Sequence, residues 1–134
     1  MPAYKTKTSV VKNRVAVMPR ISYAIDASGK NLGRVASDAA MALLGKKSAH
    51  YEKNAVLNVE VTVSNVSKMV LTEKRLRDKS YLRYSGYPGA LYETKLPEMV
   101  AKKGKEEVLR RAVMGMIPRN GLRKERMKRL ILVD

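Results

Sequence analysis

Residues 23–44 read YAIDASGKNLGRVASDAAMALL, and this stretch decides the fold. Its first five residues, Tyr23–Ala27, form a short apolar segment that a Ser-Gly pair then terminates, as at the end of a strand. Apolar side chains next recur at the spacing of one helix face: Leu32, Val35, Ala36, Ala39, Ala40, Leu43 and Leu44. Asn31 suits the helix N-cap, and Gly45 suits a left-handed C-terminal cap. We expect a strand followed by a helix of about three turns.

A valine-rich segment comes next. From Val56 to Val66, valines at positions 59, 61 and 63 alternate with polar residues, which predicts a strand. A strand, a helix and a second strand form a βαβ unit, in which the two strands are parallel and the crossover is right-handed. Met69–Thr72 predicts a further short strand just after this unit.

The rest of the chain adds helices and a last strand to the same domain. Charge, tyrosine and glycine break the periodic pattern between residues 73 and 92. Helices are predicted at 96–102, 106–116 and 121–128, and a buried strand at Leu130–Val133. No linker divides the chain, so residues 21–134 are predicted to form a single α/β domain. Residues 1–20 hold five basic residues and no acid, which favours an arm laid along a partner over an organellar targeting peptide.

Composition excludes several kinds of site. The 134 residues include no cysteine and only one histidine, His50. A disulfide framework, a thiolate nucleophile and a cysteine-ligated metal are therefore excluded, and histidine-dependent chemistry is poorly supplied. Gly29 and Gly33 fit neither the dinucleotide motif nor the phosphate-binding loop motif. We expect no cofactor, no metal ion and no small-molecule substrate.

The net charge of +16 predicts a polyanionic partner. Each lysine or arginine placed on a phosphate releases a condensed counterion, so nucleic acid is the default choice. An anionic membrane would favour basic residues gathered on one amphipathic helix, whereas here they recur along the whole chain. No segment approaches the ~20 apolar residues that span a bilayer. Nucleic acid is therefore the predicted partner, and a membrane is not.

One carboxylate invites a catalytic interpretation. Asp26 ends the first predicted strand, where α/β proteins often carry functional groups. No second carboxylate or histidine lies near it in the sequence, so a turn carboxylate that pairs with Lys30 or Arg34 is favoured. His50 follows two lysines, which favours a phosphate or 2′-hydroxyl contact over metal ligation.

Residues 81–92 read YLRYSGYPGALY and contain four of the seven tyrosines. Pro88-Gly89 suits the central positions of a type II turn. Glycines let the backbone approach a phosphate closely, and tyrosines stack on unpaired bases. The alternative is that these tyrosines pack on the edge of the sheet, because the chain contains no phenylalanine.

The last basic segment is the densest. Residues 119–129 hold six basic residues and one acid, and three more lysines lie at 102, 103 and 105. A solvated surface usually mixes charges of both signs. Phosphate binding is therefore the better explanation of this segment.

Four segments share an order and a spacing that identify a family. They are residues 25–37 (IDASGKNLGRVAS), 44–47 (LGKK), 83–89 (RYSGYPG) and 112–120 (AVMGMIPRN). These segments resemble large-subunit ribosomal protein thirteen in its bacterial form, and the resemblance runs from about Tyr23 to Leu130. It implies a three-layer α/β/α sandwich on a mainly parallel four-stranded sheet, with basic extensions.

The resemblance also implies a function. The family suggests a non-enzymatic component of the large ribosomal subunit that binds large-subunit ribosomal RNA, meets neighbouring large-subunit ribosomal proteins and acts early in assembly. An RNA-binding translational regulator that acts off the ribosome and an RNA-modifying enzyme are the alternatives. We expect a cytoplasmic location on the ribosome, and the sequence leaves open an organellar one.

The expected RNA-binding residues are basic side chains together with the tyrosines and glycines of the loop. They are Lys30, Arg34, Lys46, Lys47, His50, Lys74, Arg75, Lys79, Arg83, Tyr84, Gly86, Tyr87, Gly89, Lys102, Lys103, Arg119, Arg123, Lys124, Arg126 and Lys128. If ~8 phosphates are neutralised, the affinity for RNA falls with salt concentration with a log–log slope of about −6 to −7.

Overall fold

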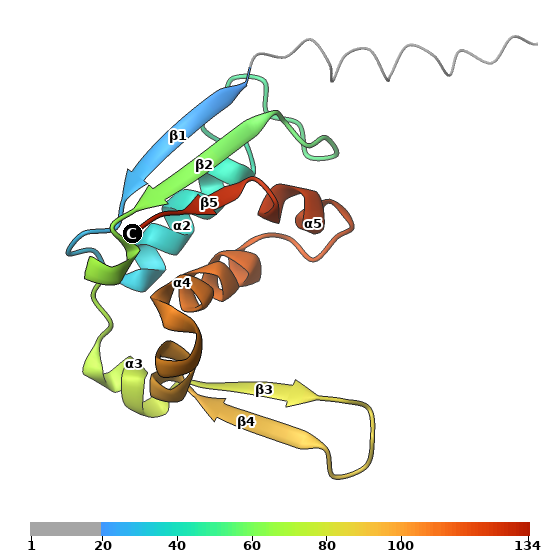
Figure 1. Ribbon diagram of the computed structural model, residues 1–134. Coiled ribbons are helices and arrows are strands. Elements are labelled where there is room, and N and C mark those ends of the chain that lie inside the picture. Colours follow the sequence, from blue (N-terminus) through green and yellow to red (C-terminus); the bar gives the residue numbers. More distant parts are fainter. Residues whose placement is uncertain (1–19) are drawn as a thin grey trace, which may run out of the picture.

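The predicted βαβ unit opens the fold. The computed structural model describes residues 20–134, so the predicted arm, residues 1–20, lies outside the described residues apart from Arg20. Strand β1 (Ile21–Asp26) leads into helix α2 (Leu32–Leu43), and strand β2 (Val59–Ser64) follows (Figure 1). The two strands are parallel, with Ile21 opposite Val59. The prediction of a parallel strand pair joined by a helix is confirmed.

The parallel sheet has three strands in the order β1-β2-β5. Strand β5 (Leu130–Leu132) pairs with β2 and confirms the predicted last strand. The expected strand at 69–72 is reduced to one isolated bridge between Asn31 and Val70. A 3₁₀ turn, η1 (Val66–Lys68), follows β2, and helix α3 (Glu73–Asp78) begins soon afterwards, which leaves little extended chain for pairing.

Helix α2 covers one face of this sheet. Val59, Val61 and Val63 of β2 are buried, as are the small residues Val35 and Ala36 on the helix face. Small side chains let the helix and the sheet approach closely. Residues on the opposite face of β1 are exposed: Ser22, Ala24 and Asp26. A three-layer sandwich on a four-stranded sheet is therefore not seen in residues 20–134.

The remaining elements are a hairpin and two further helices, and the buried residues of the longer helix belong to the same core as those of α2 and β2. Strands β3 (Ser80–Tyr84) and β4 (Leu91–Lys95) pair as an antiparallel hairpin that projects from the rest of the molecule (Figure 1). Helix α4 (Leu96–Met116) combines the two helices predicted at 96–102 and 106–116, which meet at a kink where Gly104 has a φ of +76°. Helix α5 (Leu122–Met127) lies within the predicted range of 121–128.

Two predicted turns are confirmed by the backbone. Gly45 follows the end of α2 with a φ of +79°, and a Cβ atom there would lie 2.4 Å from Leu57 Cδ1. Gly89 has a φ of +77°, and the Ala90 amide donates to the Tyr87 carbonyl at 3.1 Å. Asn31 takes the predicted N-cap position of α2, although its side chain makes no capping hydrogen bond.

Candidate nucleic-acid interface

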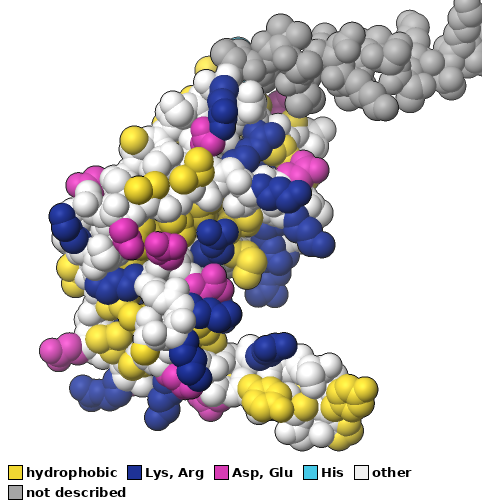
Figure 2. All heavy atoms as spheres, in the orientation of Figure 1, with side chains coloured by type: hydrophobic (Ala, Val, Ile, Leu, Met, Phe, Trp, Pro, Cys, Tyr) yellow, Lys and Arg dark blue, Asp and Glu magenta, His cyan; other side chains and the backbone are white. Residues whose placement is uncertain are grey.

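The basic side chains gather in two regions. The hairpin region comprises α3, the β3–β4 hairpin and the first half of α4. The α5 region comprises residues 44–58 and residues 119–129, which include α5. Figure 2 shows lysine and arginine side chains over both parts of the face in view. The hairpin region is one continuous stretch of chain that folds back on itself, whereas the α5 region brings together two segments far apart in the sequence.

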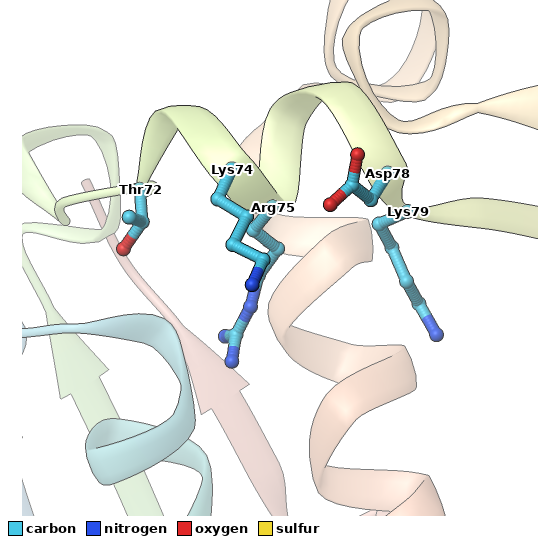
Figure 3. Close-up of a pocket in the computed structure, with 5 residues that line it drawn as sticks. All are labelled: Thr72, Lys74, Arg75, Asp78 and Lys79. Carbon is cyan, nitrogen blue, oxygen red and sulfur yellow. The ribbon is translucent and has the colours of Figure 1, made fainter.

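In the hairpin region, α3 presents three of the expected phosphate contacts. Lys74 and Arg75 extend side by side from α3, and Lys79 follows the end of the helix (Figure 3). They line a hollow of about 390 Å³ together with Thr72 and Asp78. Among the ion pairs of the described residues, none involves these three cations. Their charges are therefore available to an external anion.

A second hollow joins the hairpin to α4. It has a volume of about 180 Å³. Arg83 of β3 lines it together with Lys102 and Lys103 of α4. Lys102 forms an ion pair with Glu98 one turn earlier, but both side chains are largely exposed. Exposed pairs of this kind contribute little to stability. Two basic groups that are separate in the sequence thus share one surface.

Tyr81 lines the second hollow and is not among the predicted site residues. Lys79 Nζ lies 5.4 Å from the centre of its ring, and Arg111 Cζ lies 5.1 Å from it. Burial raises the pKa of the Tyr81 hydroxyl, against the opposing effect of the two nearby guanidinium groups of Arg111 and Arg75. In its protonated form this hydroxyl can donate a hydrogen bond.

Arg111 is the second residue that sequence reasoning missed. The apolar spacing of its helix indicates only which residues are buried. Arg111 lies beside that buried face and is half-buried. Its Nε donates to Glu107 Oε1 at 3.0 Å, which fixes the direction of the guanidinium. The Arg110-Arg111 pair in an otherwise apolar stretch was the available signal.

The tip of the hairpin is fully open to solvent. Tyr84 is 61% exposed and Tyr87 is 76% exposed. Gly86 and Gly89 both have positive φ, and a Cβ atom at either position would meet nothing within 4 Å. The alternative that the loop tyrosines pack on a sheet edge therefore does not apply to Tyr84 or Tyr87, and Tyr81 packs partly against the core.

The α5 region places the other expected contacts at the surface. Lys46, Lys47 and His50 are exposed between α2 and β2, and Lys47 Nζ lies 5.7 Å from the ring centre of Tyr23. On the other side of this region, Arg119, Lys124 and Lys128 are exposed, and Arg123 is half-buried.

Arg126 requires a correction. Only 2% of this residue is exposed, and its Nη2 atom donates to the backbone carbonyls of Ala55 at 3.0 Å and Lys53 at 3.5 Å. Arg129 likewise donates to the Leu57 carbonyl. Position 126 lies one turn after Leu122, on the inner face of α5, which explains its burial. Arg126 therefore joins α5 to residues 53–55 and is not displayed for phosphate.

Lys30 and Arg34 are exposed around the start of α2. The amide of Val70 donates to the Lys30 carbonyl at 3.1 Å, which links this turn to the segment that precedes α3. The guanidinium of Arg75 lies next to Gly33, 3.8 Å from the position of a Cβ atom there. The two predicted contacts thus border the hairpin region.

Asp26 is held as a turn carboxylate. Its Oδ1 accepts hydrogen bonds at 3.0 Å from the Ser28 amide and from Asn65 Nδ2. These bonds, the Ser28 bond first, hold the pKa of the Asp26 carboxyl below its usual value, and Lys30 adds a weaker attraction. It forms no ion pair with Lys30 or Arg34 in the described part of the chain. A carboxylate stabilised in its ionised form is poorly suited to donate a proton.

Residues 20–134 contain no group of three or more histidine or acidic residues that could hold a metal ion. Within the same range, no helix combines the length and the apolar character needed to cross a membrane. The surface described above remains the candidate site.

Comparison with known proteins identifies the family. The family model described as ribosomal protein L13 matches residues 20–133. The chain belongs to the ribosomal protein L13 family. The resemblance carried by the four sequence segments is thereby confirmed.

Curated relatives agree with this assignment over most of the chain. A protein of Syntrophus aciditrophicus named large ribosomal subunit protein uL13 is 41% identical over 97% of this chain and 86% of its own length. The protein of the same name from Pelotomaculum thermopropionicum is 38% identical over 97% of this chain and 85% of its own length. Large ribosomal subunit protein uL13m of Schizosaccharomyces pombe is 39% identical over 86% of this chain and 73% of its own length.

Proposed function

We propose that this chain is a structural component of the large ribosomal subunit and that it binds large-subunit ribosomal RNA. One observation carries the proposal: Lys74, Arg75 and Lys79 share a hollow, and none of them forms an ion pair with a described carboxylate. The names of the relatives and the net charge of +16 support the same function. The protein would then be located on the ribosome, which we expect to be cytoplasmic.

The mechanism is electrostatic and requires no substrate turnover. The α/β part supplies a rigid platform, and each basic side chain on its surface replaces counterions on a phosphate. Two basic regions on one body allow it to hold two RNA segments that would otherwise repel each other. A protein that stabilises such a junction is useful early, when the RNA is folding, and neighbouring ribosomal proteins would then pack around it.

The proposed contacts are the predicted residues without Arg126 and with two additions, Tyr81 and Arg111. The glycines of the hairpin tip, Gly86 and Gly89, have no neighbouring atoms that would prevent close approach of a phosphate. The exposed rings of Tyr84 and Tyr87 are suited to stacking on unpaired bases. The hairpin tip would therefore contact unpaired nucleotides, whereas the basic side chains contact phosphates of the RNA backbone.

The salt dependence of binding tests this proposal. We expect the affinity of the full chain for large-subunit ribosomal RNA to fall with a log–log slope of about −6 to −7. The double variant Arg75→Ala/Lys79→Ala should reduce the magnitude of the slope by about 1.5 to 2, because it removes two phosphate contacts. A filter-binding titration over several salt concentrations measures both values.

A matched control separates specific contacts from total charge. Lys68→Ala/Arg110→Ala removes the same charge from exposed positions that line none of the described hollows. We expect its slope to match that of the parent chain. A parent slope near zero, or an equal effect of the two double variants, would contradict the proposal.

The two alternatives predict different results. A regulator that acts off the ribosome would stay at the top of a sedimentation gradient, whereas a ribosomal component migrates with the large subunit at elevated salt. An enzyme would convert ribosomal RNA in an activity that Asp26→Asn abolishes. The hydrogen bonds that hold Asp26 ionised and the family assignment both favour the structural role.

A further inference from the structure

A cavity of about 410 Å³ lies at the base of the hairpin, among α2, α3 and α4. Its inner wall is apolar. Leu32 and Leu96 are buried there, and Ala112 is half-buried. Gly115 lines the cavity with its backbone, since it has no side chain. The volume falls within the range of about 300 to 1,000 Å³ that small-molecule sites occupy.

The mouth of the same cavity is cationic. Arg75, Lys79 and Arg111 line it, and no carboxylate does. Arg111 is already paired with Glu107 at 3.0 Å, whereas Arg75 and Lys79 form no ion pair with any described residue. The ring of Tyr81 lies beside Lys79 and Arg111, and burial raises the pKa of its hydroxyl.

We infer that this cavity holds one unstacked nucleotide of the bound RNA, with its base against Leu32, Ala112 and Gly115 and its phosphate on Arg75 and Lys79. The inference rests on the proposed function, because it names the chemical unit of RNA that the site receives. The Tyr81 hydroxyl is then placed to donate to the sugar or the phosphate.

A whole nucleotide explains the cavity better than a phosphate alone. A phosphate needs cations and donors, but it gains nothing from Leu32 or Ala112. A base gains from both, since burying its apolar faces removes them from water. The planar guanidinium of Arg111 adds a surface of the kind on which bases stack.

The surroundings of the cavity suit a continuous RNA strand. Arg75 and Lys79 line both this cavity and the neighbouring hollow that contains Lys74. On the other side, Tyr81 and Arg111 also line the hollow of Arg83 and Lys102. The phosphates before and after the inserted nucleotide would therefore meet cations on either side of the cavity.

Nucleotide titrations of the full chain test the inference. Uridine monophosphate, uridine and inorganic phosphate are added separately to isotopically labelled protein, and the backbone amide resonances are followed by NMR. We expect uridine monophosphate to shift Ala112 and Gly115 together with Arg75 and Lys79. If uridine monophosphate and inorganic phosphate shift the same residues and leave Ala112 and Gly115 unmoved, the cavity is only an anion site and the inference fails.

A filled cavity provides the second test. Gly115→Leu adds a side chain at the cavity wall without removing a cation, and a Cβ atom at Gly115 would meet nothing within 4 Å. Leucine also has a higher helix propensity than glycine, so the variant is expected to fold. We expect it to bind ribosomal RNA about tenfold more weakly than the parent chain does, with an unchanged salt slope, because no phosphate contact is lost.

The matched control is Ala101→Leu, which adds a similar side chain to an exposed position of the same helix and lines none of the described cavities. It should bind RNA as the parent chain does. Equal binding by Gly115→Leu and the parent chain would overturn the inference and leave the proposed function intact. A parent chain that binds RNA without salt dependence would instead contradict the proposed function.

Discussion

The sheet with α2 and the β3–β4 hairpin differ most clearly in where they place their apolar side chains. In the sheet, Val61 and Val63 are completely buried. In the hairpin, Leu82, Leu91 and Tyr92 are each 60% exposed or more. The hairpin has no core of its own, and a two-stranded hairpin by itself is marginally stable in water. Its side chains are therefore available to a partner, whereas those of the sheet maintain the fold.

The hairpin is anchored at its base. The Leu96 amide donates to the Lys79 carbonyl at 2.9 Å, and the Leu96 side chain is completely buried. Tyr81 packs between Lys79 and Arg111 near the same point. An element fixed at one end and exposed at the other can present its tip to RNA without loss of core packing.

The largest expected effect contrasts the same substitution in the hydrophobic core and in the hairpin. Leu109→Ala removes a completely buried side chain of α4 and should lower the free energy of unfolding by about 3 kcal/mol. Leu82→Ala removes a side chain that is 66% exposed in the hairpin and should change it by less than about 0.5 kcal/mol. Urea unfolding measures both. Equal losses would show that the Leu82 side chain is packed in solution and that the hairpin contributes to the core.

An intermediate effect is expected where a cation acts as part of the fold. Arg126→Ala leaves the carbonyls of Lys53 and Ala55 without their donor and should lower the free energy of unfolding by about 2 kcal/mol. Lys124→Ala, at an exposed position of the same helix, should change stability by less than about 0.5 kcal/mol and mainly weaken RNA binding. If Arg126→Ala kept full stability and lost RNA affinity, Arg126 would belong to the interface after all.

The smallest expected effect concerns how the free energy of unfolding depends on pH near Asp26. The pKa of Asp26 is lowered in the folded protein, so its hydrogen bonds stabilise the fold at pH values above its unfolded pKa, and this contribution is lost as the pH falls through the folded pKa. Asp26→Asn should therefore reduce the loss of stability between about pH 6 and about pH 3. Urea unfolding at both pH values tests this, with the exposed Asp78→Asn as the control. An unchanged pH dependence would show that Asp26 does not contribute.

Much of the fold was predictable from the sequence because its signals are local. The apolar spacing of residues 32–44 predicts α2, and the alternation around Val61 predicts β2. The positive φ of Gly45 and Gly89 follows from turn chemistry. The basic composition likewise predicts a nucleic-acid partner without any coordinates.

The assembly of the site was less predictable. The sequence does not reveal that Arg126 turns inward, because the charge of an arginine says nothing about which face of α5 packs on the chain. The grouping of Arg83 with Lys102, and of Tyr81 with Arg111, depends on contacts between β3 and α4. The strand expected at residues 69–72 also depended on pairing with a neighbouring strand. In the structure this segment forms one isolated bridge, between Val70 and Asn31.

The sequence by itself determined the helix and strands of the βαβ unit and the sign of the partner's charge, since periodicity and composition act within a segment. Only the tertiary structure decided which cations are buried, which share a surface and where the apolar-walled cavity lies. The physical reason is that these properties arise from packing between segments far apart in the chain, and one residue's position along its own helix or strand does not specify its neighbours.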